Sequence, residues 1–300
     1  MTGPLRLRHR VVQAVREHAL WERGQRVAVA VSGGLDSTVL LDLLAITTGW
    51  HGAELTVVTV HHGSPHADAH VEVVRRQAAA LDLPLTVARV HPSSSSEAAL
   101  RDARYAALDA LQVDRVALAQ HADDQAETVL LHLMRGTGVR GLAGMCRRRG
   151  RYVRPLLDEP RAALEAWARA RDLRWAEDPT NNSPQYLRNR LRHEILPALE
   201  RLRPGARAAM ARSAGHAGEL DRWIDLLADE RSPPWEAAWI ADGPTPVVRR
   251  VLVRALPGVS AASLDAIVAA ARVGHGSLTF GRWHVDVVRG SVTVQDAQRV

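Results

Sequence analysis

The sequence contains no lysine, so all 39 of its basic residues are arginines, an absence that we attribute to compositional bias of the genome. It has a single cysteine, Cys146, which excludes an internal disulfide and any zinc or iron–sulfur site built from several cysteines. No run of about 18 apolar residues is present, so no membrane-spanning helix is expected. The opening segment MTGPLRLRHR is basic but has no apolar stretch behind it, so no signal peptide is expected. These absences fit a cytoplasmic protein without membrane contact.

Positive charge is concentrated in one part of the chain. The 300 residues carry a net charge of +6, and the segment 135–212 alone holds 18 arginines against 8 acidic residues. A basic block of this kind is often only a solvated face. Arginine forks also match phosphate oxygens, so the sharper interpretation is a surface for a polyanion such as RNA.

Short valine-rich runs alternate with helical patterns through the first half of the chain. The runs are apolar almost throughout, as buried strands are, and they read RVAVAV, LTVVTV, LPLTVARV and DRVALAQ. Helices are expected over 36–44, 68–81, 97–111, 123–134 and 161–171. The alternation predicts an α/β fold with a Rossmann-like parallel sheet, covered on both faces, that binds ligands beyond the carboxyl ends of its strands.

Two domains are expected. Residues 1–205 would form the sheet domain with a helical tail, in which YLRNRLRHEILPALERL reads as an arginine-rich helix bent or interrupted at Pro197. Residues 215–300 would form a small mixed α/β module that either contacts RNA or only packs, with two strand-like runs separated by Arg-Gly. Ser94 and Glu97 have the spacing of a capping box, and RWAEDPTNNSPQY reads as a polar connection.

The apolar run VAVAV is broken by Ser-Gly-Gly where it passes into a helix. Glycines let the backbone approach an anion closely, and the following helix offers unpaired N–H groups. Ser32 and Ser37 can donate hydroxyls to phosphate oxygens, whereas Asp36 would repel phosphate unless a metal ion lay between them. The pattern predicts a nucleotide site with Mg²⁺ at Asp36, against the simpler interpretation that Asp36 and Ser37 only cap the helix.

This pattern resembles the pyrophosphate loop of the N-type ATP pyrophosphatases and lacks the Gly-Lys-Ser/Thr of a Walker loop. The resemblance implies that ATP is cleaved between its α- and β-phosphates and that an oxygen of the substrate is adenylated. AMP and pyrophosphate would be the products. The residues implied to cradle ATP are Ser32, Gly33, Gly34, Leu35, Asp36 and Ser37.

Three acidic residues, Asp123, Asp124 and Glu127, stand at the start of the helix expected over 123–134. Acids in a first helical turn can simply complement the helix dipole. Glu127 shares a helix face with both aspartates, however. The functional interpretation is a carboxylate pocket at the end of a strand, able to hold a cationic amine or Mg²⁺ beside the ATP.

A longer stretch, AQHADDQAETVLLHLMRGTGVRGLAG, closely resembles the bacterial tRNA(Ile)-lysidine synthases, as do EAALRDARYAAL before it and RPLL, EDPTN and YLRNRLRHEILPAL after it. The resemblance runs from about residue 27 to residue 199. It implies an enzyme that adenylates the wobble cytidine of the isoleucine tRNA with a CAU anticodon and joins free L-lysine to it. Its reactants would be ATP with Mg²⁺, lysine and this tRNA, and its products lysidine, AMP and pyrophosphate.

Roles for single residues follow from the same resemblance. The implied catalytic residues are Asp36, Asp124, Glu127 and Arg104, with His62 and Arg101 as further contacts of ATP. The lysine would be held by Asp123, Asp124 and Glu127, and the tRNA by Arg135, Arg140, Arg188, Arg190 and Arg192. Alternatively, Arg101 and Arg104 only pair with Asp102 or Asp109 on their own helix. Arg188, Arg190 and Arg192 cannot all share one helix face, so at least one should point inward, to Glu194 or the acids of EDPT.

The sequence also departs from the family pattern. Ser64-Pro65 stands where Leu-Arg usually follows His-Gly, and Gln120 stands where a second histidine is common. The further C-terminal domain of longer relatives is expected to be missing, which leaves open how tRNA(Met) is rejected. The oligomeric state is open as well, a homodimer included.

Other functions share parts of this pattern. A tRNA thiolase would need more cysteines than Cys146, and a glutamine-dependent synthetase would need a glutaminase half. An ammonia-using NAD synthetase would not need the basic block. A non-enzymatic RNA-binding module would not need Asp36, Ser37, Asp124 and Glu127.

Overall fold

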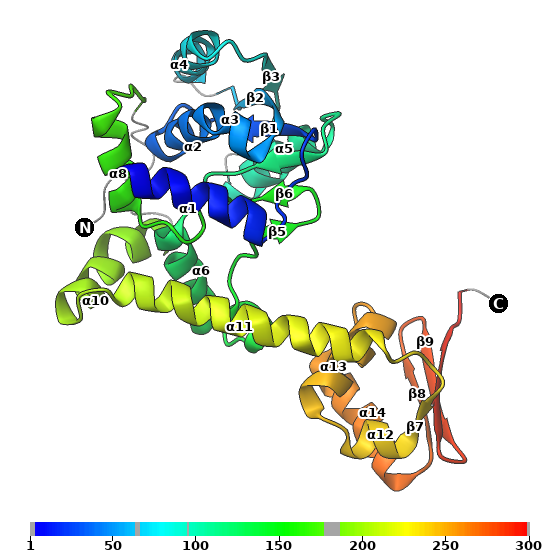
Figure 1. Cartoon of the computed structure of the whole chain (residues 1–300). Helices are drawn as coiled ribbons and strands as arrows, with labels where there is room; N and C mark the ends of the chain where they lie inside the picture. The colour runs from blue at the N-terminus through cyan, green and yellow to red at the C-terminus, as the bar shows by residue number, and fades with distance from the viewer. Residues whose placement is uncertain (1–3, 64–66, 95, 177–186, 299–300) are drawn as a thin grey trace. The chain divides into compact units, whose positions relative to one another are not determined.

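The computed structural model describes residues 4–63, 67–94, 96–176 and 187–298 (Figure 1). The chain divides into two compact units, Met1–Gly215 and His216–Val300. The dipeptide Ser64-Pro65 and most of the predicted polar connection, EDPTN included, lie outside the described residues. Within the described residues, no helix combines the length and the apolar character needed to cross a bilayer.

A six-stranded sheet with the order β3-β2-β1-β4-β6-β5 forms the centre of the first unit. Its strands are β1 (Arg26–Ala30), β2 (Glu54–His61), β3 (Leu85–Arg89), β4 (Arg115–Ala117), β5 (Arg148–Arg149) and β6 (Tyr152–Val153). Neighbouring strands are parallel except for the β5–β6 pair. The predicted α/β fold with a mostly parallel sheet is therefore confirmed. The sequence pattern missed β5 and β6, whose two residues each are too few to show a periodicity.

Helices precede, connect and follow these strands. They are α1 (Pro4–Glu17), α2 (Leu35–Ile46), α3 (Thr48–His51), α4 (Ala67–Ala80), α5 (Glu97–Asp109), α6 (Ala122–Met134), α7 (Val139–Leu142) and α8 (Arg161–Ala170), followed by α9 (Leu187–Arg190), α10 (Leu196–Leu202) and α11 (Ala206–Asp229). The boundary between the two units falls within α11.

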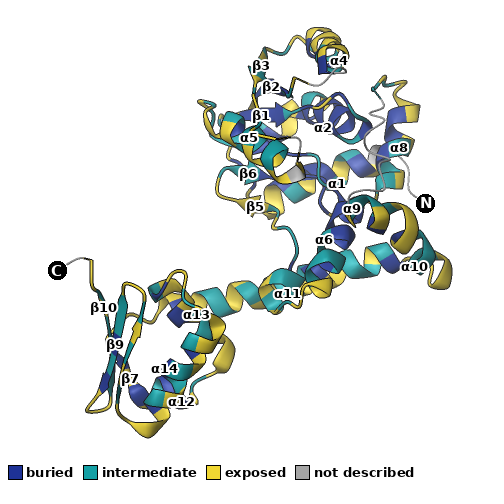
Figure 2. Ribbon diagram, turned by 180° about the vertical axis from the view of Figure 1, so that it is seen from behind, coloured by how far each residue is buried: buried dark blue, intermediate teal, exposed yellow. Residues whose placement is uncertain are grey.

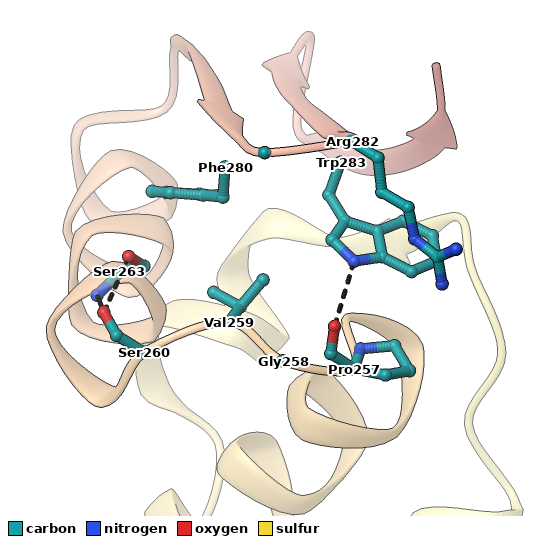
Figure 3. A pocket seen from close by; sticks show the side chains of 9 residues that line it. Pro257, Gly258, Val259, Ser260, Ser263, Phe280, Arg282 and Trp283 are labelled. Atoms are coloured by element: carbon teal, nitrogen blue, oxygen red, sulfur yellow. Dashed lines mark hydrogen bonds between the residues drawn. The ribbon is translucent and has the colours of Figure 1, made fainter. Parts of the chain in front are cut away.

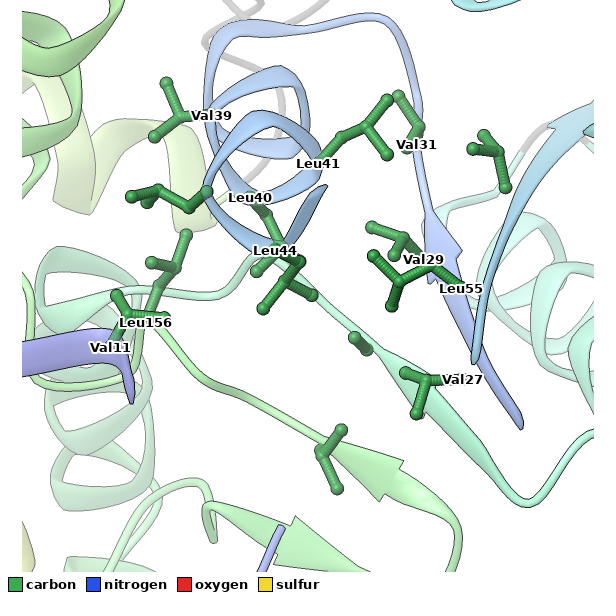
Figure 4. Close-up of a cluster of buried hydrophobic side chains, with 14 of the residues drawn as sticks. Val11, Val27, Val29, Val31, Val39, Leu40, Leu41, Leu44, Leu55 and Leu156 are labelled. Carbon is green, nitrogen blue, oxygen red and sulfur yellow. The ribbon is translucent and has the colours of Figure 1, made fainter. Parts of the chain in front are cut away.

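The two faces of the sheet are buried in separate apolar clusters. Val27 and Val29 of β1 point into the larger one, where they meet α2, α1 and α8 (Figure 4). Ala28, between them, belongs to the cluster that Leu108 of α5 covers. Successive strand residues face opposite sides, so an unbroken apolar run is what a strand covered on both faces requires. The helix α2 is buried along most of its length (Figure 2), which fixes the segment that follows β1.

Two local expectations are corrected. The N-cap of α5 is Ser96, whose hydroxyl accepts the Ala99 N–H at 3.2 Å, so the capping box predicted from Ser94 was wrong; the Ser94 hydroxyl contacts that of Ser96 instead. The arginine-rich helix is interrupted by a π-helical turn over Leu191–Ile195, before Pro197 rather than at it. Pro197 lies in the first turn of α10, where a missing N–H costs little.

The second unit has its own sheet and core. Its antiparallel sheet has the order β7-β10-β9-β8, built from β7 (Trp235–Glu236), β8 (Gly276–Phe280), β9 (Trp283–Val288) and β10 (Ser291–Asp296). Its helices are α12 (Ala237–Asp242), α13 (Thr245–Ala255) and α14 (Ala261–Val273). Arg289 and Gly290, both with positive φ, form the turn between β9 and β10, so the predicted pair of strands separated by Arg-Gly is present.

A buried carboxylate connects α2 to α8 in the first unit. Asp42 is 5% exposed and accepts hydrogen bonds from Trp167 Nε1 at 2.8 Å and from Arg171 Nη2 at 3.0 Å. The Asp42 carboxylate raises the pKa of the Arg171 guanidinium, because the ion pair favours the charged form. The loop that follows β1 leads directly into α2, so the contact of Asp42 with α8 helps to fix the position of that loop.

We expect Asp42→Ala to lower the free energy of unfolding by about 2–3 kcal/mol, because it leaves the indole N–H and the guanidinium without their acceptor. Glu72→Ala is the matched control, since it removes the exposed ion pair with Arg76 and should cost less than about 1 kcal/mol. Urea denaturation of both variants measures the two values. Equal losses would show that Asp42 contributes no more than a surface charge.

Candidate functional site

The centre of the sheet brings two helix starts together. Strand β1 lies between β2 and β4, so the strand order changes direction beside it. In open α/β sheets, ligands bind beyond the carboxyl ends of the strands at such a switch point. The segment from Ser32 follows β1 and enters α2, and the segment from Leu118 follows β4 and enters α6.

The loop after β1 is held by its own hydrogen bonds. Gly33 has a φ of 85°, and a Cβ there would lie 3.3 Å from the carbonyl oxygen of His70, so a larger residue would strain the turn. The Ser37 hydroxyl donates to Gly34 O at 2.9 Å and accepts from the Ser32 N–H at 3.2 Å. Gly34 is the N-cap of α2 and makes no side-chain cap bond. The capping interpretation of Asp36 and Ser37 is therefore wrong, and the helix start suits an anion.

Asp36 has one engaged and one orphaned oxygen. Its Oδ2 lies 3.5 Å from His121 Nε2 and 4.0 Å from Arg161 Nη1. Its Oδ1 is buried and has no hydrogen-bond partner among the described residues. Burial opposes ionisation of Asp36, but the His121 contact and the charges of Arg161 and Arg192 outweigh it and lower its pKa. An ionised carboxylate with a free oxygen beside a phosphate loop fits a magnesium ligand.

Magnesium would need further ligands from outside the protein. No group of three His, Cys, Asp or Glu side chains able to hold a metal occurs in the part of the chain that the structure describes. Mg²⁺ commonly binds through one or two carboxylates together with substrate phosphates and water. The residues present therefore fit an ion that arrives with a nucleotide.

His121 connects the two helix starts. Its side chain is 1% exposed, and its Nε2 lies 3.5 Å from both Asp36 Oδ2 and Asp124 Oδ2. Its Nδ1 accepts the backbone N–H of Asp123 at 3.2 Å. The backbone N–H of His121 donates to Asp124 Oδ2 at 3.1 Å, and the two bonds together form a capping box for α6. Burial lowers the pKa of His121, but the surrounding carboxylates prevail and raise it. His121 Nε2 therefore lies between the Asp36 and Asp124 carboxylates, 3.5 Å from each, without a hydrogen bond to a described residue.

Two of the predicted arginines pair with two of the predicted acids. Glu127 is 1% exposed and accepts from Arg188 Nε at 2.8 Å and from Arg192 Nε at 2.5 Å. Asp124 Oδ1 accepts from Arg192 Nη2 at 2.8 Å. Arg188 and Arg192 are four residues apart on one helix face, whereas Arg190 lies 3.6 Å from the exposed Glu194. Two arginines thus point inward, as expected of at least one, but their partners among the described residues are Asp124 and Glu127 of α6 rather than Glu194.

Asp123 lies at the edge of the same cluster. Its Oδ2 accepts the backbone N–H of Arg161 at 3.1 Å, and its Oδ1 lies 3.5 Å from Arg207 Nη1. Sequence reasoning missed Arg161 and Arg207 as members of the site, and it favoured a structural role or a substrate contact for His121 over a role as base. The position of His121 directly before the acids of α6 was the signal for that residue.

The other predicted ATP contacts gather near β2 and α5. Burial and the charges of Arg101 and Arg188 lower the pKa of Arg104, and burial and the Arg104 charge lower the pKa of His62. The buried Nδ1 of His62 has no hydrogen-bond partner among the described residues. The Arg101 guanidinium lies 5.1 Å from the ring centre of Tyr105. Neither arginine forms an ion pair with Asp102 or Asp109 within the described residues, which removes the helix-pairing alternative.

Arg135 and Arg140 occupy the glycine-rich segment after α6. Arg135 is the C-cap of that helix, Arg140 lies in α7, and both are exposed. The segment is anchored by the buried Gln125 amide, which donates to Ala143 O at 3.1 Å and accepts the Met145 N–H at 2.7 Å. Both guanidiniums are therefore displayed to solvent on an anchored loop.

A double-mutant cycle should separate the buried cluster from surface pairing. For Glu127→Gln and Arg192→Gln we expect a coupling free energy of about 2 kcal/mol or more, because each single variant removes one charge from a buried network and leaves the remaining charges only partly compensated. Arg190→Gln with Glu194→Gln is the matched control and should give less than about 0.5 kcal/mol. Chemical denaturation of the six variants and the wild type provides both numbers. A coupling in the buried pair no larger than in the control would contradict a cooperative cluster.

Comparison with known proteins agrees with this geometry. The chain is 48% identical over 236 residues to a tRNA(Ile)-lysidine synthase of Pseudomonas fluorescens, covering 73% of this chain and 53% of that protein. It is 43% identical over 228 residues to one of Aromatoleum aromaticum, covering 73% and 54%. The chain thus spans about half the length of the curated relatives it matches.

Solved structures and family models give the broader relationship. The U34-tRNA thiolase NcsA from Methanococcus maripaludis, solved with its [4Fe-4S] cluster, superposes with a TM-score of 0.57 over 70% of this chain and 78% of its own. At 16% identity, that similarity concerns the fold alone. The family model described as a PP-loop domain matches residues 6–199. With this match over most of its length, and with the loop after β1 shaped for an anion, the chain belongs to the PP-loop family.

Proposed function

We propose that this chain is a cytoplasmic ligase that joins free L-lysine to the wobble cytidine of the isoleucine tRNA with a CAU anticodon, at the expense of ATP. The observation that carries the proposal is the contact of His121 with both Asp36 and Asp124, which sets the phosphate loop beside the carboxylate cluster. The names of relatives at 43–48% identity support the choice of substrates.

The first step would be adenylation. The serine hydroxyls and the start of α2 would bind the phosphates of ATP, with Asp36 holding Mg²⁺. The metal ion, when bound, would neutralise part of the negative charge of the phosphates. The cytidine carbonyl oxygen would attack the α-phosphorus, and the bond to pyrophosphate would break. Arg104, partly buried and without an ion pair to a described acid, is our candidate for balancing charge at the adenylated base.

The second step would be attack by lysine. The deprotonated ε-amine would add to the activated carbon, the C–O bond to AMP would break, and the amine would lose its second proton. Asp124 and Glu127 are the candidates for holding the lysine, with Asp123 at the edge of the cluster. Arg188 and Arg192 already balance their charge, so a lysine ammonium must join or displace these guanidiniums.

The test is pyrophosphate release from ATP in the presence of lysine and the CAU-anticodon tRNA, with each reactant omitted in turn. We expect release to require the tRNA, and lysidine to form only when lysine is present as well. Asp36→Ala should reduce release at least 100-fold while the protein remains folded, because the metal ligand is lost and the loop keeps its own hydrogen bonds. Full activity of that variant would remove Asp36 from the reaction, and release without tRNA would remove RNA as substrate.

We infer that the exposed arginines Arg135, Arg140 and Arg190 contact tRNA phosphates. Replacing Arg140 or Arg190 by Gln should weaken tRNA binding and reduce the slope of log affinity against log salt by about 0.7–0.9 for each lost contact. Arg192→Gln should instead destabilise the fold, because it breaks the buried cluster. Filter binding at several salt concentrations and thermal unfolding distinguish the two classes. Unchanged slopes for Arg140→Gln and Arg190→Gln would exclude both from the RNA interface.

A further inference from the structure

The second unit contains a cavity that the proposed chemistry does not use. It has a volume of about 460 Å³ and is formed by the α13–α14 connection, the start of α14 and the β8–β9 turn (Figure 3). Cavities that bind small molecules or single nucleotides fall in this size range. Its lining includes Pro257, Val259, Phe280 and Trp283, so most of its wall is apolar.

The aromatic part of the wall is set by the register of a hairpin. Phe280 and Trp283 are paired across β8 and β9 and flank the turn at Gly281, which has a φ of 60°. Side chains of a directly opposed pair lie on the same face of a sheet, so both rings border the same cavity. The Trp283 Nε1 donates to Pro257 O at 3.2 Å, which fixes the indole against the α13–α14 connection (Figure 3). The cavity thus has two aromatic surfaces, one of them held in place.

The charge at the cavity is positive and local. Among the described residues, Arg282 is the only charged one in the lining, and its guanidinium lies 4.6 Å from the Trp283 ring centre. Asp296, which is not part of the lining, lies with its Oδ2 3.7 Å from Arg282 Nε. The Arg282 side chain is still 46% exposed. The unit as a whole is nearly balanced, with 9 arginines and 10 acidic residues in 216–300. A polyanion would therefore gain little from the general field of this unit, and recognition must come from the cavity itself.

We propose that this cavity binds one unstacked nucleotide of an RNA, with its base against Phe280 and Trp283 and its phosphate at Arg282. Aromatic rings accept any base by stacking, and an adjacent guanidinium supplies the phosphate contact. RNA as the source of the nucleotide rests on the proposed function. Binding at this cavity requires neither ATP nor lysine, so it can be measured without turnover.

The test is the affinity of the full chain for a fluorescein-labelled single-stranded RNA hexamer, measured by anisotropy. Phe280→Ala should weaken binding roughly tenfold, and Arg282→Gln should lower the salt slope by about 0.7. Phe280→Leu keeps the apolar volume and should still weaken binding, which separates stacking from packing. Trp50→Ala is the matched control, because Trp50 is 59% exposed in the first unit with the Arg16 guanidinium 6.0 Å from its ring centre. It should leave binding unchanged.

A second measurement tests whether the RNA is bound at this cavity or elsewhere on the chain. Photocrosslinking with a 4-thiouridine hexamer should label peptides containing 257–263 or 276–288, and Phe280→Ala should remove that label. Crosslinks confined to 135–212, or affinities equal for all variants, would overturn the proposal. AMP that competes with the hexamer at equal concentration would show a mononucleotide site and overturn it as well. If the wild-type chain is inactive on tRNA but Phe280→Ala and Arg282→Gln still weaken RNA binding, the proposed function is refuted and the cavity assignment is retained.

Discussion

Buried negative charge is the constraint on which the candidate site depends. Asp36, Asp124 and Glu127 lie close together at one sheet edge, and Glu127 is almost inaccessible to water. Carboxylates this close repel one another unless cations lie among them. The fold places Arg161 of α8 near Asp36, and Arg188 and Arg192 against Asp124 and Glu127, while His121 Nε2 lies between Asp36 and Asp124. The geometry of each acid is therefore set by a partner distant in sequence.

This constraint connects the loop chemistry to the core. Helix α2 is buried on nearly all sides, so the turn from Ser32 to Ser37 has a fixed position relative to β1. The α6 capping box fixes His121 relative to β4 in the same way. Because β1 and β4 are adjacent parallel strands, two rigid helix starts meet there. A nucleotide and a cationic substrate can then be held side by side without a flexible connection between their sites.

The two units use charge differently. In the first, ion pairs gather near the starts of α2 and α6 and leave one carboxylate oxygen, Asp36 Oδ1, without a described partner. In the second, Arg250 pairs with Asp221 and Asp225, which joins α13 to α11 in a closed network. Orphaned polar atoms beside a helix start indicate a ligand, whereas a closed network indicates packing. This contrast is why we assign the nucleotide of the reaction to the first unit and only a stacking cavity to the second.

The sequence alone determined the strand–helix alternation, the phosphate loop and the acids of α6, because each depends on residues close together in the chain. Valine-rich runs specify buried strands, and Ser-Gly-Gly specifies a turn that only small residues permit. Tertiary structure decided that Arg188 and Arg192 pair with Asp124 and Glu127, which lie 61 and 68 residues away in the Arg188–Glu127 and Arg192–Asp124 contacts. Local periodicity shows that three arginines cannot share one helix face, but the partner of each depends on which helix the chain later packs against it.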